Sequence, residues 1–203
     1  MLFIRNETFR QYIRLYPVTA ILISLNLIMY GLTLYTGGAT AVNLYKWGGM
    51  VTTPPAEGAE VWRWLSSIFL HGSGIHILMN SFSLYVFAPP LEKLLKPQMY
   101  VLLYLASGFS GSAVSAYFSN QAVVSIGASG SVYGILGSYF AIIILTKYAM
   151  DVQSRQTIMV LLGIGILGSI FMSDVNGLAH FGGFIGGFLL YFIWYVLKRL
   201  NQR

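Results

Sequence analysis

Charged residues divide the chain into long apolar stretches that carry no charge. A helix needs about 20 predominantly apolar residues to cross the hydrocarbon core of a bilayer. One of the stretches, 97–146, is long enough for two such helices, and the polar triplet Ser119-Asn120-Gln121 marks a break between them. The uncharged stretches cover 15–45, 64–91, 97–146, 156–173 and 175–197.

The pattern predicts an all-α membrane protein with six transmembrane helices. The expected helices cover 17–36, 74–93, 98–118, 128–147, 156–173 and 177–197. The first apolar run exceeds the roughly 7–15 residues of a signal-peptide core, so a retained signal anchor is favoured over a cleaved leader. We therefore expect a cytoplasmic or interfacial segment over 1–16, a six-span domain over 17–197 and a cytoplasmic tail over 198–203.

Composition supports a membrane protein and removes several other classes. The 203 residues are 56% hydrophobic and 9% charged, whereas a soluble domain carries about 25% charged residues. The chain has no cysteine, which excludes thiol catalysis, iron–sulfur clusters and cysteine-ligated zinc. Its 12 basic residues give a net charge of +6 but are scattered, so no nucleic-acid surface is indicated. We expect neither a metal nor a cofactor.

The distribution of basic residues predicts the orientation. Six helices place both termini on one side, and that side carries ten of the basic residues, against Lys46 and Arg63 on the other. Because lysine and arginine favour the cytoplasmic side, both termini are expected in the cytoplasm, most simply of a bacterial plasma membrane, with an organelle membrane as the alternative. Trp47, Trp62 and Trp64 are expected in an aromatic belt at the outer surface, and Arg63 as an interface anchor.

Three polar residues fall at one depth in the predicted helices. Ser129, His76 and His180 each lie 17 or 18 residues before the lysine that ends their span. At 1.5 Å per residue, this places them about 25–27 Å above the inner boundary of a core about 30 Å thick. Since polar groups are costly in lipid, three of them at one level favour a functional site near the outer surface.

The neighbours of these residues suit nucleophilic catalysis. Ser129 lies in Gly127-Ala128-Ser129-Gly130 at a helix start, where free backbone N–H groups favour a developing oxyanion. Asn80 shares a helix face with His76, and Tyr133 shares one with Ser129. Small residues at intervals of four, Gly130 with Gly134 and Ala179 with Gly183 and Gly187, permit two helices to approach closely.

Each of these residues also has a structural interpretation. Ser129 alone is more simply a helix cap, Tyr133 a packing residue, and His76 with Asn80 a pair of hydrogen-bonding groups between helices. The glycines alone are packing devices, and His180 alone can bond a neighbouring helix. Their conjunction at one depth favours a shared site.

The motifs resemble those of the rhomboid family of intramembrane serine proteases. His76-Ile-Leu-Met-Asn80, Gly127-Ala128-Ser129-Gly130 and Ala179-His180-Phe-Gly-Gly183 with a following Gly187 are similar to the family's H-x-x-x-N, G-x-S-G and A-H-x-x-G-x-x-x-G. Trp62-Arg63 is similar to the Trp-Arg pair of its first outer loop. The resemblance extends over about residues 10–200 and implies the six-helix bacterial form of the rhomboid-like bundle.

The resemblance implies a role for each matching residue. Ser129 would be the nucleophile and His180 the base of a dyad. His76, Asn80 and the backbone N–H of Ser129 would form the oxyanion hole, and Tyr133 would stack beneath the His180 ring. Gly127, Gly130 and Gly183 would support this arrangement. Asp174, six residues before His180, is the less favoured third member of a triad.

Substrates are expected to be transmembrane proteins, cleaved near the outer boundary. A transmembrane helix satisfies its own backbone hydrogen bonds, so it must unwind there before attack. His71 and Ser73 are candidates to line a water entrance. The fifth helix is the candidate for a lateral gate, with a moving loop as the alternative. An inactive client-binding relative and a small transporter are the rival functions.

Overall fold

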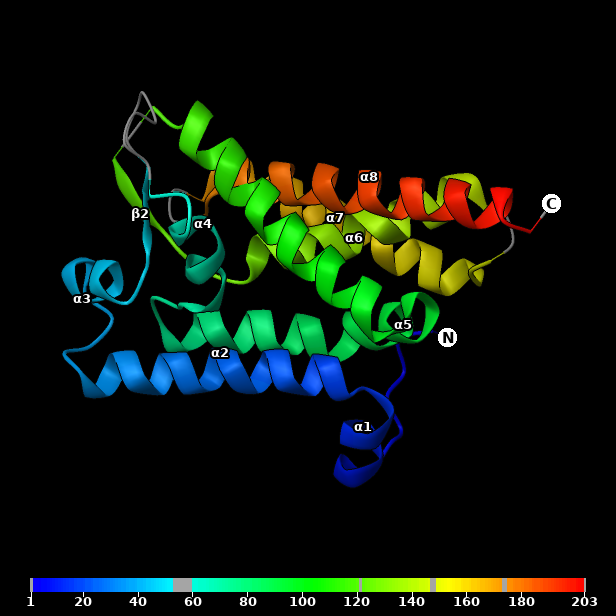
Figure 1. Ribbon diagram of the computed structural model, residues 1–203, viewed down its shortest axis with the longest axis horizontal. Helices are drawn as coiled ribbons and strands as arrows, with labels where there is room; N and C mark the ends of the chain where they lie inside the picture. Colours follow the sequence, from blue (N-terminus) through cyan, green and yellow to red (C-terminus); the bar gives the residue numbers. More distant parts are fainter. Residues whose placement is uncertain (1, 53–59, 121, 147–148, 173–174, 203) are drawn as a thin grey trace.

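The structure, a computed structural model, describes residues 2–52, 60–120, 122–146, 149–172 and 175–202. This part of the chain is predominantly helical (Figure 1). Its helices are α1 (Phe9–Leu15), α2 (Pro17–Tyr35), α3 (Ala41–Lys46), α4 (Arg63–Ser66), α5 (Gly74–Phe118), α6 (Ser129–Leu145), α7 (Val152–Phe171) and α8 (Gly177–Leu200), with a 3-10 turn over Ser67–Phe69. Two short strands, β1 (Met50–Thr52) and β2 (Val123–Ser125), complete the fold.

Four of the described helices, α2, α5, α7 and α8, are long and apolar enough to cross a membrane. Helix α6 is also apolar but has 17 residues. Helices α2 and α8 begin at the residues that the sequence pattern predicts, and the all-α membrane class is confirmed at this level. Helix α7 starts earlier than expected, because Asp151 caps it by accepting a 2.9 Å hydrogen bond from the backbone N–H of Ser154.

The 45 residues of α5 form two helical segments. Lys96 interrupts the helix with a φ of 65° and a ψ of 159°. The next residue is Pro97, whose ring disfavours helical geometry at the residue before it. Figure 1 shows α5 running beside α2, turning at the end of the bundle where the N-terminus lies, and returning across the molecule.

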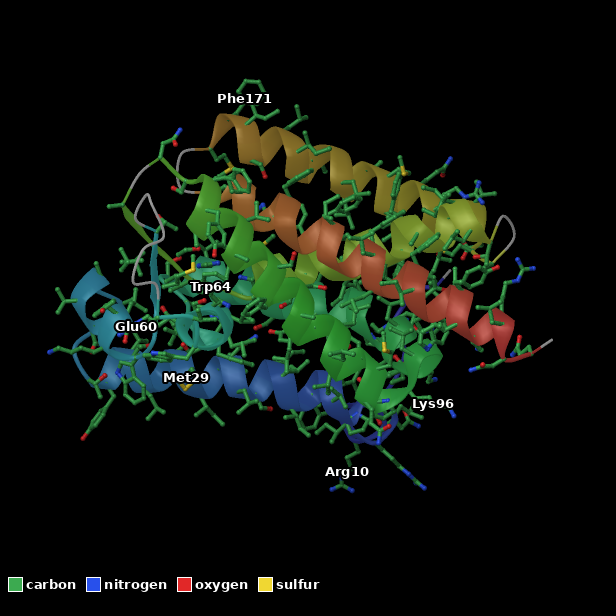
Figure 2. The ribbon with its side chains drawn as sticks, turned by 45° about the horizontal axis from the view of Figure 1, so that its top comes forward. Arg10, Met29, Glu60, Trp64, Lys96 and Phe171 are labelled. Carbon is green, nitrogen blue, oxygen red and sulfur yellow. The ribbon has the colours of Figure 1, made fainter. Side chains whose placement is uncertain are left out.

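The two ends of the bundle differ in what they carry. Both termini lie at one end, while α3, α4 and β2 lie at the other (Figure 1). Figure 2 shows Lys96 and Arg10 toward the first end, and Glu60 and Trp64 toward the second. This separation agrees with a chain whose basic residues concentrate on the side of its termini.

Helix α6 lies in the core, enclosed by α5 and α8, and its buried serines are hydrogen-bonded there. Ser131 donates a 2.7 Å hydrogen bond to the carbonyl of Tyr104 in α5, and Ser138 donates one of 3.1 Å to that of Gly187 in α8. Helix α7 is peripheral, and its buried side chains are Ser154, Ile158 and Leu162.

The β-pair is a departure from the helical pattern. Strands β1 and β2 pair antiparallel, with Met50 opposite Ser125 and Thr52 opposite Val123. The sequence pattern did not predict these strands, because each has three residues and lies within a longer apolar or polar stretch. The pairing anchors the segment that leads into α6 to the loop that follows α3.

Two residues expected at the membrane interface are buried instead. Trp64 is 6% exposed and packs with Met50, Ala116 and Phe109, so its placement in an aromatic belt was wrong. Arg63 is 9% exposed, and its guanidinium donates to Glu60 and to the carbonyl of Tyr45. Arg63 therefore links Glu60 to the backbone of Tyr45 within the protein and is not an interface anchor.

A buried carboxylate holds the start of α2. Glu92, 3% exposed, accepts hydrogen bonds of 2.9 Å from the backbone N–H groups of Val18 and Thr19, and one of 2.6 Å from the Thr19 hydroxyl. The first N–H groups of a helix have no partner within the helix and carry positive partial charge. Glu92 accepts hydrogen bonds from these N–H groups and offsets their positive partial charge, which explains why an acid is buried at the start of α2.

Candidate active site

Ser129 is the first residue of α6 and is half-buried. Two residues earlier, Gly127 adopts a φ of +116°, a conformation that favours glycine. Its backbone N–H donates a 2.9 Å hydrogen bond to the carbonyl of Ser67, which fixes the turn against the 3-10 segment. The turn at Gly127-Ala128 thus fixes the backbone conformation that leads into α6.

Two side chains of α5 converge on this turn. A Cβ atom at Gly127 would lie 2.5 Å from Nε2 of His76 and 3.7 Å from Nδ2 of Asn80. The missing side chain of Gly127 therefore leaves the space that the His76 ring uses. The Asn80 amide donates a 3.1 Å hydrogen bond to the carbonyl of His76, and its second N–H group is available for another acceptor. These are the donor types that stabilise an oxyanion.

The helices that carry Ser129 and His180 are in direct backbone contact near these residues. A Cβ atom at Gly183 would overlap the carbonyl oxygen of Gly130, and a Cβ atom at Gly187 would overlap that of Gly134. Glycine is thus required where α6 and α8 cross, as small residues are at close membrane-helix contacts. Gly130 follows Ser129 directly, and Gly183 is three residues after His180.

His180 lies in the first turns of α8 against Tyr133 of α6. The two rings stack with their centroids 4.0 Å apart and their planes 12° from parallel. Asn176 starts α8 by accepting a 3.0 Å hydrogen bond from the N–H of Ala179, while its amide donates to the hydroxyls of Ser115 and Ser125. The start of α8 is therefore tied to α5 and to β2, the strand that leads to Ser129.

A residue that the sequence pattern did not identify contacts a nitrogen of the His180 ring. Ser169 of α7 places its Oγ 3.1 Å from Nδ1 of His180 and donates a 2.8 Å hydrogen bond to the carbonyl of Gly165. A hydroxyl has a single proton. When that proton is directed to Gly165, the short contact is a hydrogen bond from Nδ1 of His180 to Ser169; in the other tautomer Nδ1 would accept from Ser169.

Sequence reasoning missed Ser169 because serine is common in membrane helices. What identifies Ser169 is its contact with His180, and this contact joins two separate helices, α7 and α8. Its position four residues after Gly165 is the available sequence clue. A Cβ atom at Gly165 would overlap the hydroxyl of Tyr133, so the same face of α7 contacts both members of the stacked pair.

The remaining candidates divide between the interior, the surface and the undescribed part of the chain. His71 is fully buried, with its ring edge-on to His76 at 5.0 Å between centroids, so it packs against that ring, and its place at a water entrance stays a prediction. Ser73 is exposed and accepts a 3.2 Å hydrogen bond from the N–H of His76 as the cap of α5. Asp174, the alternative third member, lies outside the described residues.

The described residues contain no cluster of three or more histidine or acidic side chains that could hold a metal ion. The chemical groups gathered at this end of the bundle are a serine at a helix start, a histidine with an oriented ring, and a histidine and an amide beside the turn before the serine.

Comparisons with known proteins show the family of the chain. The family model described as Rhomboid domain matches residues 58–197. The chain is 33% identical to "Putative rhomboid protease YdcA" of Bacillus subtilis (strain 168), over 95% of this chain and 96% of that protein. It is 36% identical to RHOMBOID-like protein 4 of Arabidopsis thaliana over 82% of this chain, and 30% identical to Rhomboid protease GluP of B. subtilis over 84%. The chain covers 43% and 33% of the length of these last two relatives.

Proposed function

This chain belongs to the rhomboid family of intramembrane serine proteases, and on that premise we propose that Ser129 and His180 form its catalytic dyad. The backbone contact between α6 and α8 carries the proposal. It brings together the helix that starts at Ser129 and the helix turn that holds His180, through the Gly130–Gly183 crossing. A serine can attack a carbonyl when a base lies within hydrogen-bond reach, and close helix crossing is the means of achieving this in a membrane.

In the proposed first half-reaction, Ser129 Oγ attacks the scissile carbonyl carbon and Nε2 of His180 takes its proton. With hydrogen on Nδ1, in the tautomer that donates to Ser169, Nε2 has a free lone pair for this step. The carbonyl oxygen becomes negative and accepts hydrogen bonds from Nε2 of His76, Nδ2 of Asn80 and the N–H of Ser129. The C–N bond then breaks, and His180 delivers the proton to the leaving amine.

Water completes the cycle. His180 removes a proton from the water molecule as its oxygen attacks the acyl carbon on Ser129, and the ester bond breaks to release the acid product and the serine hydroxyl. Tyr133 supports the His180 ring by stacking, and Ser169 fixes its orientation and tautomer. No metal or cofactor is needed for any of these steps.

The proposed substrates are transmembrane proteins cut near the outer membrane boundary. Helix α7 is the proposed lateral gate, because it packs at the edge of the bundle and much of its apolar surface is exposed. Phe171 at its end is 79% exposed and projects away from the rest of the molecule (Figure 2). Local unwinding of the substrate helix would precede cleavage, because its carbonyl groups are otherwise hydrogen-bonded within the helix.

The proposed topology has six membrane passes over 17–197, two of them contributed by α5, with residues 1–16 and 198–203 in the cytoplasm of a bacterium. The turn at Lys96 and the common position of the two termini support this count (Figure 1). The chain has no cysteine, so the variants Gln202→Cys and Thr40→Cys each carry a single thiol for labelling. A membrane-impermeant maleimide added to intact cells should label the cysteine at Thr40 and leave that at Gln202 unlabelled. The reverse pattern would invert the topology.

The function is tested by comparing the wild-type protein with Ser129→Ala and His180→Ala, each reconstituted in lipid with a single-span reporter that has small residues near the outer boundary. Cleavage by wild type alone supports the dyad. Equal cleavage by wild type and Ser129→Ala would remove Ser129 from its role and indicate a contaminating protease.

A fluorophosphonate probe separates a wrong reporter from an inactive site. Labelling of wild type, with loss in both variants, would show a working nucleophile even if the chosen reporter is not cut. Retained reporter binding with neither cleavage nor labelling would support the client-binding function in place of proteolysis.

A further inference from the structure

An apolar cavity opens at the end of the bundle opposite the proposed active site. Its volume is about 460 Å³, within the range of small-molecule pockets. It lies between α5, α6 and α8, and the N-terminal residue Leu2 forms part of its wall. Its apolar lining includes Leu91, Leu94, Ile142 and Met150.

The rim of this cavity is basic and aromatic. Lys198 and Arg199, both exposed, line it together with Trp194 and Tyr195. Nζ of Lys198 lies 4.8 Å from the centroid of the Trp194 ring, and Cζ of Arg199 lies 5.5 Å from that of Tyr195. Each cation is therefore held over a ring at the mouth of the cavity.

The charged residues that line the cavity, Lys198 and Arg199, are both basic. Among the described residues that line the cavity, none is acidic. The carboxylate of Glu92 accepts hydrogen bonds at the start of α2, and that of Asp151 accepts them from Ser154 at the start of α7. The site thus offers two cations to an anion and an apolar interior to a hydrocarbon chain.

We propose that this cavity binds one anionic phospholipid, with an acyl chain in the apolar interior and the headgroup phosphate between Lys198 and Arg199. Basic pockets between transmembrane helices at a membrane surface are suited to anionic headgroups. Aromatic side chains concentrate at the same level of the bilayer. Favourable charges at the C-terminus of α8 explain the cations in part, but they do not explain an apolar cavity directly beneath them.

The experiment is lipid titration of the purified full-length protein, read by native mass spectrometry. The probes are phosphatidylglycerol and phosphatidylcholine with matched acyl chains. A cation near an anionic headgroup contributes about fivefold in affinity. We therefore expect the first phosphatidylglycerol to bind about 10- to 30-fold more tightly than phosphatidylcholine, and Lys198→Gln/Arg199→Gln to abolish this preference.

Two variants distinguish the cavity from general surface charge. Arg10→Gln/Arg14→Gln removes the same charge from the exposed face of α1 and should leave the preference intact. Leu94→Trp fills the cavity, keeps both cations and should remove the tight site for both lipids. Both substituted regions are at the surface, so the fold is expected to persist.

Three results would overturn the proposal. Equal binding of the two lipids by wild type would remove the anionic site. Unchanged tight binding in Leu94→Trp would place the lipid on the surface and not in the cavity. If wild type binds no lipid tightly but forms a dimer, and Leu94→Trp does not form it, the occupant of the cavity is a second copy of the chain.

Discussion

Ser169 and His180 are joined by a 3.1 Å contact between Oγ and Nδ1 across two helices of the bundle. When the Ser169 hydroxyl donates to the carbonyl of Gly165, it accepts from the imidazole, and this pattern goes with the tautomer that carries hydrogen on Nδ1. In the proposed dyad this contact would orient His180 as a carboxylate does in a catalytic triad. Here a serine on the peripheral helix α7 supplies it.

The first prediction concerns Ser169→Ala. Loss of one such hydrogen bond is worth about 0.5–1.5 kcal/mol, so kcat should fall about 3- to 10-fold while KM changes little. Ser169→Thr retains the hydroxyl and should restore most of the activity. Cleavage kinetics of the reconstituted protein measure both effects.

A spectroscopic readout separates positioning from general loss of structure. The chain has three histidines, so ¹⁵N-histidine spectra can be assigned with His71→Gln and His76→Gln variants. Wild type should show His180 with hydrogen on Nδ1, and Ser169→Ala should show a mixture of tautomers. An unchanged tautomer in Ser169→Ala would contradict the positioning role.

The second prediction concerns the stacked ring. Tyr133→Phe keeps the 4.0 Å stack on His180 and should retain near-wild-type activity. Tyr133→Leu removes it, and since such ring pairs contribute about 0.5–1.5 kcal/mol, kcat should fall several-fold. The comparison is made by reporter cleavage at matched protein folding, verified by the apparent Tm. If both variants lose activity equally, the hydroxyl and not the stack is what matters.

The third prediction concerns the turn before Ser129. Gly127→Ala would place a residue with a side chain at a positive φ that favours glycine, and its Cβ atom would press against Nε2 of His76. Displacing one oxyanion donor typically costs about 10²–10³ in kcat, so a loss of about 100-fold is expected. Gly31→Ala is the matched control, because a Cβ atom there meets nothing within 4 Å. Near-normal turnover by Gly127→Ala would show that this turn does not position the oxyanion donors.

The fourth prediction concerns the loop that contains Arg63. Its guanidinium lies 3.8 Å from the centroid of the Tyr45 ring and hydrogen-bonds both Glu60 and the Tyr45 carbonyl. Lysine lacks the planar fork that makes these contacts together. Arg63→Lys should therefore destabilise the protein by about 1–3 kcal/mol, seen as a lower apparent Tm. Arg10→Lys, on an exposed face of α1, is expected to leave the Tm unchanged.

The fifth prediction concerns acid stability at the start of α7. Hydrogen bonds from the Ser154 hydroxyl and N–H lower the pKa of Asp151 below its usual value. The resulting stabilisation is present above the pKa of the unfolded chain and is lost as pH falls through the lower, folded-state pKa. The apparent Tm of wild type should therefore fall further in acid than that of Asp151→Asn, which keeps a capping oxygen without the charge. Parallel acid profiles for the two proteins would remove Asp151 from this role.

The sequence alone determined the helical membrane class and the family. Long uncharged stretches predict membrane helices because hydrocarbon tolerates few charged side chains. The spacing of His76 with Asn80, of Gly127 with Ser129, and of His180 with Gly183 follows from local helix and turn geometry, so it can be recognised in one dimension. The comparisons confirm the family, while the roles of these residues stay a prediction.

Only the tertiary structure decided what surrounds those residues. The contact of Ser169 with His180, the burial of Trp64 and Arg63, and the pairing of β1 with β2 each join segments that lie apart in the chain. A hydrophobicity pattern records how apolar each segment is, but it does not record which neighbour a side chain faces. Those neighbours depend on how closely the helices approach, and in this protein glycines such as Gly183 permit that approach.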